Sequence, residues 1–355
     1  MPPLARRGCG RLRVSGAAKD TPVARTEVDG GARRAGTARE PGGGDSGSEG
    51  CDVRMGTGTG AFSGEAARAR FMAAYDRALG RWPGEPEAVD LATSYGDSRV
   101  YRYPADADAA TDREATPAVL LPGLNASPTV WAPHVAALGR DRVVYAPELL
   151  GEPGHSTQTT PLGTGDALAA WLDEVLDGLR VERAHLVGLS YGGWIACQQA
   201  TRSPERVASL TLAEPAGVLA PLRPTFLLGT VAVMVCGVRG LQRRWFGRLI
   251  GETGERPEDF EAQLNLTVES LRSFRSRLPT PRRATEAELG GLTVPVLVLL
   301  VRGSRSTDAR RAAERARHLV PDVRIKVLEG TGHGLPEGDV NRLVPAFLGE
   351  VEGVG

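Results

Sequence analysis

A serine lies between two glycines in the segment GLSYG at positions 188–192. The short apolar run before it, Ala184–Val187, predicts a buried strand, and the residues after it predict a helix. In a strand–turn–helix setting this turn exposes the serine hydroxyl, because the glycines remove side chains that would collide as the chain doubles back. The N-terminus of the following helix favours developing negative charge. The segment therefore predicts a nucleophile, Ser190.

A serine hydroxyl needs a general base, and His333 is the best placed of the five histidines. It lies in the glycine-rich segment EGTGHG, positions 329–334, between the last predicted strand and the final predicted helix. His155 also follows a predicted strand and is the alternative base. The other three histidines fall on predicted helices or strands, and we expect them to be structural: His134, His185 and His318.

Short apolar runs alternate with amphipathic segments after residue 90. The runs predict buried strands over Ala118–Leu121, Val143–Ala146, Ala184–Val187, Leu210–Ala213, Val294–Val301 and Val323–Leu328. Apolar residues at helical spacing predict helices over Ala167–Leu179, Trp194–Thr201, Ala309–Leu319 and Val340–Leu348. This alternation predicts an α/β fold, a mostly parallel sheet with helices on both faces and chemistry at the carboxyl ends of the strands.

A long segment without a clear strand separates the strand ending near Ala213 from the one starting at Val294. A segment of this length in a compact domain is expected to fold, and its helical and Pro/Gly-rich stretches predict a helical cap at about 216–288. The cap includes the apolar run Phe226–Val238. This run is shorter than the about 20 residues that span a bilayer, so we expect it to cover an apolar pocket without stable membrane insertion.

From about Phe71 to the end, the chain resembles the α/β-hydrolase superfamily, in its carboxylesterase-like branch. The matching pieces follow in family order: LPGL at 121–124, APELLG at 146–151, the serine turn, VPVLV at 294–298 and GTGH at 330–333. The resemblance implies a Ser–acid–His triad and hydrolysis of a small or medium apolar carboxylic ester through an acyl-enzyme. It also implies an oxyanion hole built from the backbone N–H groups of Leu124 and Tyr191. No metal or organic cofactor is implied.

The triad acid departs from the family's usual position. The family usually carries Asp or Glu three residues after a glycine that ends the fifth predicted strand, Val294–Val301, but counting from Gly303 reaches Ser306, and an alignment on the following helix reaches Ser304. Two substitutes remain: Asp308, in the same loop, and Glu214, just after the preceding strand. Asp308 would also serve as an ordinary helix N-cap, and Glu214 as a strand-end cap. Glu214, Asp308 and the absence of any acid therefore remain alternatives.

The missing carboxylate motivates a second hypothesis, a catalytically weak or inactive homologue that binds a small apolar ligand beneath the cap. The same residues would also serve C–C bond hydrolysis, thioester cleavage or acyl transfer. A haloalkane dehalogenase is disfavoured, because serine and not aspartate occupies the turn. Three arginines near the acid loop could bind an acidic substrate, although solvated surface charge is the expected role: Arg302, Arg305 and Arg310.

The composition bounds the remaining function classes. The 355 residues carry 43 basic and 43 acidic side chains, which excludes a strongly basic nucleic-acid binder as the default. Four scattered cysteines predict neither a disulfide framework nor a CxxC metal site, and they favour a reducing, cytoplasmic setting.

The N-terminal part differs in composition from the rest. Residues 1–60 hold 14 of the 45 glycines and no aromatic residue, which predicts a disordered extension before a hydrolase domain at 61–355. Arg6 and Arg7 are not followed by an apolar run, so no secretory signal is expected. Met55, at the edge of this extension, is an alternative start.

Overall fold

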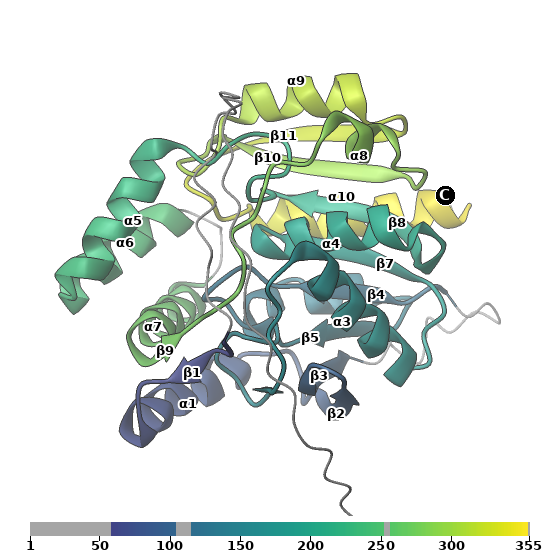
Figure 1. Cartoon of the computed structure of the whole chain (residues 1–355). Helices are drawn as coiled ribbons and strands as arrows, with labels where there is room; N and C mark the ends of the chain where they lie inside the picture. The colour runs from purple at the N-terminus through teal and green to yellow at the C-terminus, as the bar shows by residue number, and fades with distance from the viewer. Residues whose placement is uncertain (1–57, 104–114, 252–255, 354–355) are drawn as a thin grey trace, which may run out of the picture. The chain divides into compact units, whose positions relative to one another are not determined.

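The computed structural model of the chain describes residues 58–103, 115–251 and 256–353 (Figure 1). The predicted disordered extension lies outside these ranges except for its last three residues. The main sheet has nine strands, in the order β11-β10-β8-β7-β4-β5-β3-β2, with β6 paired to β3. Their bounds are β2 Glu87–Thr93, β3 Gly96–Tyr103, β4 Ala118–Leu121, β5 Val144–Pro147, β6 Thr157–Gln158, β7 Ala184–Leu189, β8 Val207–Ala213, β10 Val296–Gly303 and β11 Val323–Thr331.

The strands from β11 to β5 run parallel to one another, and they are the six that the sequence predicts. The five inner strands are mostly apolar because both faces of the sheet are covered there, as in α/β proteins generally, whereas the edge strand β11 alternates apolar and charged residues. The hairpin of β2 and β3 adds an antiparallel edge that the sequence analysis missed. Strand β2 has no fully buried residue, so it lacks the apolar run that marked the central strands.

Helices cover both faces of the sheet. One face packs against α3 Gly165–Gly178, α4 Tyr191–Arg202, α8 Glu286–Gly290 and α9 Ala309–Leu319. The other face packs against α1 Glu65–Leu79, α2 Val135–Leu138 and α10 Glu337–Glu352. Figure 1 shows α3 and α4 in front of the sheet and α10 behind it. The predicted doubly covered, mostly parallel sheet is confirmed, and it brings the ends of β4, β7, β8 and β10 to one edge.

Residues 216–288, which we call the cap segment, lie between β8 and α9 along the chain. This segment contains α5 Pro224–Cys236, α6 Arg239–Ile250, α7 Pro257–Ser273, the short strand β9 Phe274–Arg275 and the start of α8. Strand β9 pairs with β1 Ala61–Phe62, and α7 packs against α1. Strand β1 and helix α1, which precede β2 in the chain, thus contact the cap segment. The sequence pattern gave no indication of this contact. Among the described residues, no helix combines the length and apolar character needed to cross a membrane.

Candidate active site

Ser190 occupies the sharp turn between β7 and α4. Its φ of 53° lies in the left-handed region, which non-glycine residues adopt only where the surrounding structure enforces it. A Cβ atom on Gly188 or Gly192 would overlap backbone atoms of Gly192 or Leu121, so only glycine fits on either side. The Ser190 N–H donates to the Ala213 carbonyl at 2.9 Å, which ties the turn to the end of β8. The predicted strand–turn–helix setting is present.

Two backbone N–H groups lie next to this serine. Tyr191 is the first residue of α4, where no earlier turn of helix supplies a carbonyl acceptor. Leu124 follows Gly123, whose Cα–H side lies so close to Ser190 that an added Cβ would come within 3.3 Å of the Ser190 Cβ. Within the ranges that the structure describes, the Leu124 N–H has no hydrogen-bond acceptor. Both N–H groups are therefore available to a ligand oxygen.

His333 lies in the loop after β11, and its side chain is 17% exposed. The loop is held by the end of α6, because the His333 and Gly334 N–H groups donate to the Leu249 and Ile250 carbonyls at 2.5 and 2.7 Å. The His333 ring shares one cavity with Ser190. Ser190 Oγ has no hydrogen-bond partner among the described residues; such contacts are often long before a substrate binds.

Glu214 reaches His333 from the end of β8. Its carboxylate Oε2 lies 3.2 Å from His333 Nδ1, and its side chain is fully buried. Oε1 accepts the Val301 N–H at 2.7 Å, and Oε2 accepts the Ser304 hydroxyl. The Glu214 backbone is in the left-handed region, with φ of 45°. A buried carboxylate needs such donors, and β10 with its following loop supplies them.

Ser306 joins the same cluster. Its hydroxyl lies 2.7 Å from His333 Nδ1 and 3.4 Å from Glu214 Oε2. Ser304 and Ser306 are the two positions at which the sequence alignment expected the acid. At these positions the hydroxyls of two serines contact the carboxylate of Glu214, which follows the neighbouring strand β8. Counting residues could locate this contact point, but not the strand that supplies the carboxylate.

Asp308 lies apart from His333. Its carboxylate accepts the Arg311 N–H at 3.1 Å as the N-cap of α9, and it lies 3.9 Å from Arg223. The side chain is 40% exposed. Of the two carboxylates singled out in the sequence, the structure brings Glu214 and not Asp308 to the histidine.

The other histidines have structural surroundings. His155 is exposed, packs edge-on against Tyr75 and does not line the cavity with Ser190. His185 is buried between Ser209 and Glu352, and His318 contacts the Glu314 carbonyl on α9. His134 does line the cavity, but its Nδ1 contacts Asn341 and burial lowers its pKa to about 4. It is therefore neutral and poorly basic at neutral pH.

The cavity beside Ser190 has a volume of about 400 Å³ and mostly apolar walls. It is lined by residues that follow β4 and β7 and by residues of the cap segment. The apolar lining includes Trp131, Leu222, Phe226, Leu227, Phe246 and Leu278. Among the described residues, no cluster of His, Cys, Asp or Glu has the arrangement of a metal site. Cys197 is buried and Cys236 exposed, and both are free thiols.

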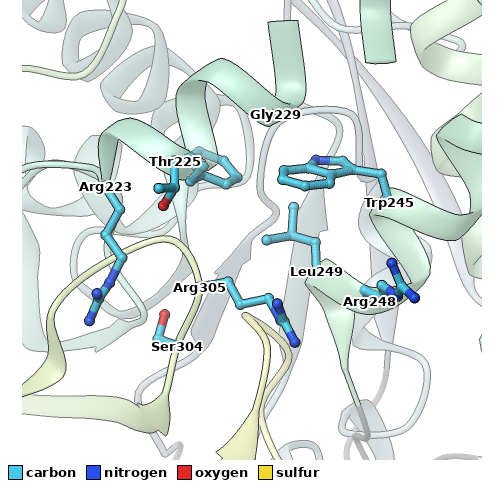
Figure 2. A pocket seen from close by; sticks show the side chains of 9 residues that line it. Arg223, Thr225, Gly229, Trp245, Arg248, Leu249, Ser304 and Arg305 are labelled. Atoms are coloured by element: carbon cyan, nitrogen blue, oxygen red, sulfur yellow. The ribbon is translucent and has the colours of Figure 1, made fainter. Parts of the chain in front are cut away.

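A second cavity of about 490 Å³ adjoins the first and shares Phe226 and Leu249 with it. Arg223, Arg248 and Arg305 all line it, and Figure 2 shows these side chains with Trp245 and Leu249. The sequence analysis singled out Arg305 but gave no indication of its neighbours, because Arg248 comes from the cap segment. Basic side chains of distant segments therefore line one cavity beside the candidate active site.

Glu152 is a buried carboxyl group that the sequence analysis did not identify. It follows β5, and its Oε2 accepts the Asn125 N–H at 2.6 Å, one residue beyond Leu124. Its Oε1 is buried with no hydrogen-bond partner among the described residues. Burial raises the pKa of Glu152 to about 7. Glu152 thus supports the loop that presents the Leu124 N–H.

A model of the alpha/beta hydrolase family matches residues 118–344, more than half of the chain. The chain belongs to the α/β-hydrolase family. Two relatives from Bacillus subtilis (strain 168) are similar to most of this hydrolase. "Carboxylesterase YbfK" is 30% identical over 289 residues, which cover 79% of this chain and 93% of the relative. "Uncharacterized carboxylesterase nap" is 28% identical over 294 residues, which cover 80% of this chain and 94% of the relative.

Solved structures of Bacillus subtilis carboxylesterases have the same fold as this hydrolase. The naproxen esterase (carboxylesterase NP) superposes with a TM-score of 0.69 at 26% identity, covering 81% of this chain and 97% of that structure. Carboxylesterase CesB (YbfK) superposes with a TM-score of 0.70 at 25% identity, covering 82% of this chain and 100% of that structure. The resemblance stated from the sequence motifs is confirmed at the level of family and fold.

Proposed function

We propose that this chain is a serine hydrolase that cleaves carboxylic esters of small or medium apolar molecules through an acyl-enzyme intermediate. One observation carries the proposal: Ser190, on its strained turn, shares a cavity with His333, whose Nδ1 faces the buried Glu214 carboxylate at 3.2 Å. Nucleophile, base and orienting acid thus come from the ends of three strands. The carboxylesterase relatives support ester hydrolysis as the reaction.

In the proposed acylation step, Ser190 Oγ attacks the ester carbonyl carbon while His333 Nε2 takes the hydroxyl proton. The carbonyl oxygen becomes an oxyanion and accepts the Leu124 and Tyr191 N–H groups; one such donor contributes about 10²–10³ in kcat in known hydrolases. Glu214 stabilises the imidazolium through Nδ1–H. His333 then returns the proton to the alkoxide oxygen, the C–O bond breaks, and the alcohol leaves.

In the proposed deacylation step, a water molecule takes the position of the alcohol. His333 removes one proton as the water oxygen attacks the acyl carbon, and the same proton then returns to Ser190 Oγ. The carboxylic acid is released and loses its proton to solvent at neutral pH. Each cycle consumes one ester and one water and regenerates the free serine.

The apolar lining of the cavity supports an apolar substrate. About 400 Å³ lies within the range of small-ligand pockets and accommodates a ring system or a short acyl chain. Rigid aromatic walls from Trp131, Phe226 and Phe246 favour shape selection over hydrogen bonding. We therefore assign the substrate to small or medium apolar esters without naming one.

The alternative hypothesis, a weak or inactive homologue that binds a small apolar ligand, rested on the serines at 304 and 306. The contact of Glu214 with His333 supports the active enzyme over this alternative. The alternative predicts ligand binding with no Ser190-dependent turnover.

The test is turnover of p-nitrophenyl butyrate by the full chain and by Ser190→Ala. We expect kcat to fall by about 10⁴–10⁶ in the variant, because the nucleophile is lost and only binding and the oxyanion hole remain. The matched control is Ser94→Ala, which removes an exposed hydroxyl distant from the cavity and should leave turnover within about twofold of wild type. Equal turnover by wild type and Ser190→Ala would end the esterase proposal.

A further inference from the structure

The α5–α6 hairpin, residues 224–250, carries an unusual apolar surface. Nine large apolar side chains are exposed in the described residues, and seven of them lie between positions 227 and 241. Leu228 is 70% exposed and Val235 is 82% exposed, and α5 has no buried residue. Exposed patches of this kind mark interaction surfaces in folded proteins. One side of α5 lines the active-site cavity through Phe226 and Leu227 and packs against α6 and α7 through Phe226 and Val233, whereas Leu228 and Val235 face solvent.

The same hairpin is purely cationic. No acidic residue occurs between positions 215 and 251, whereas five arginines do: Arg223, Arg239, Arg243, Arg244 and Arg248. Arg239 and Arg243 pair with Glu269 and Glu261 of α7. Arg244 and Arg248 form no ion pair with any residue that the structure describes. The apolar surface is thus bordered by exposed arginine side chains.

The hairpin also lines the cavity that contains Ser190. Figure 1 shows α5 and α6 side by side, extending outward from the end of the sheet. At the base of the hairpin, Arg223, Arg248 and Arg305 line the second cavity (Figure 2). Phe226 and Leu249 line both that cavity and the one that contains Ser190. A surface that covered the hairpin would therefore lie against the wall of the active site.

We infer that the α5–α6 hairpin docks the hydrolase on an anionic lipid surface. Exposed Leu and Val side chains enter the boundary between headgroups and acyl chains, and arginines contact the lipid phosphates. Long arginine side chains reach the headgroups while their methylene stems cover apolar surface. The docking is peripheral and needs no spanning helix. The docking does not depend on the proposed esterase activity. Where both hold, apolar esters would enter the active site from the lipid phase.

Charge favours a lipid surface over a second copy of this chain as the occupant. Two copies joined through this face would bring their Arg244 and Arg248 side chains together with no acidic residue of the hairpin between them. Like charges placed together in an interface are destabilising. Anionic headgroups supply the opposite charge and, beneath it, an apolar phase for Leu228 and Val235.

The test is co-sedimentation of the full chain with vesicles of phosphatidylcholine alone and with about 30% phosphatidylglycerol. We expect binding to the anionic vesicles to be at least about tenfold tighter and to weaken as salt rises from about 0.05 to 0.5 M. The double variant Leu228→Gln/Val235→Gln should reduce anionic-vesicle binding by about tenfold or more, since it removes the most exposed apolar side chains. Arg244→Gln/Arg248→Gln should reduce both the binding and its salt dependence.

Matched controls remove similar groups elsewhere. Val327→Gln changes an exposed apolar side chain on β11, and Arg310→Gln removes an arginine that pairs with Glu314 on α9. Both should bind vesicles like wild type. Hydrolysis of a water-soluble ester by Leu228→Gln/Val235→Gln should stay at the wild-type rate, which separates docking from catalysis.

Three results would overturn the inference. In the first, wild-type protein binds anionic vesicles no better than phosphatidylcholine vesicles. In the second, the hairpin variants bind as wild type does. In the third, light scattering shows a fall in oligomeric mass of the Leu228→Gln/Val235→Gln variant with vesicle binding unchanged; the face would then belong to a second copy.

Discussion

Glu214 and Glu152 are both buried glutamates at strand ends beside one cavity, yet their surroundings differ. Glu214 receives the Val301 N–H and the Ser304 hydroxyl, and its remaining lone pairs face Ser306 and His333. Glu152 receives the Asn125 N–H, and one of its oxygens is buried without a partner among the described residues. A buried carboxylate is charged at modest cost only where donors surround it. The loop after β10 builds such an environment for Glu214.

Glu214 follows β8, whereas the resemblance placed the acid in the loop after β10, and yet the Glu214 carboxylate contacts His333. The positions that usually carry the carboxylate hold Ser304 and Ser306, and both hydroxyls point at the carboxylate arriving from β8. The histidine therefore contacts a carboxylate at this edge of the sheet, and two serine hydroxyls occupy the positions where the family resemblance placed the acid. The longer Glu side chain makes the reach from the neighbouring strand feasible.

Among changes to the triad acid and its surroundings, the largest expected effect comes from neutralising Glu214. In Glu214→Gln we expect kcat/KM for a p-nitrophenyl ester to fall by about 10⁴-fold, since the imidazolium loses its charged partner and its preferred tautomer. Asp308→Asn is the matched control and should change kcat/KM by less than about twofold, because its carboxylate only caps α9. Thermal unfolding of both variants checks that the fold is retained. A greater loss in Asp308→Asn would reverse the assignment.

A smaller effect is expected when the acid is returned to its usual loop. Glu214→Gln/Ser306→Asp should recover at least about tenfold of the lost kcat/KM, because position 306 already touches His333 Nδ1 at 2.7 Å. Glu214→Gln/Ser304→Asp should not recover activity, since Ser304 contacts Glu214 and not the histidine. Recovery in the second double variant alone would show that the other alignment is the functional one.

The last expected effect is on stability and not on catalysis, and it concerns Glu152. Its pKa rises from an ordinary 4.5 to about 7 in the folded chain, so the folded state binds more protons between these values. The free energy of unfolding therefore falls as pH rises from about 4.5 to about 7. Glu152→Gln has no titrating group at this position and does not lose stability in this way. The free energy of unfolding of the variant minus that of wild type should therefore be about 3 kcal/mol larger at pH 8 than at pH 4. Urea unfolding at both values measures the difference.

The control for that measurement is Glu205→Gln, which replaces an exposed glutamate outside the protein interior. The comparison with wild type is needed because His134 has the opposite dependence. Burial lowers the pKa of His134 to about 4, so its contribution to stability is lost as pH falls toward that value. A stability difference for Glu152→Gln that does not vary with pH would contradict the assigned protonation.

The sequence predicted the central strands and the local parts of the site well, because each rests on neighbouring residues. The β7 run with its glycine-flanked Ser190, and the glycine-rich loop around His333, are signals a few residues long. The contact between His333 and Glu214 joins residues 119 positions apart, so the sequence could not choose between Glu214 and Asp308. Glu152 gave no signal for the same reason, since its burial depends on the packing of the whole domain.

The central claim is tested most directly by labelling with a fluorophosphonate probe followed by peptide mass spectrometry. We expect one adduct on wild-type protein, located on Ser190, no adduct in Ser190→Ala, and much slower labelling in Glu214→Gln. An adduct on another residue, or equal labelling of wild type and Ser190→Ala, would contradict the proposed nucleophile.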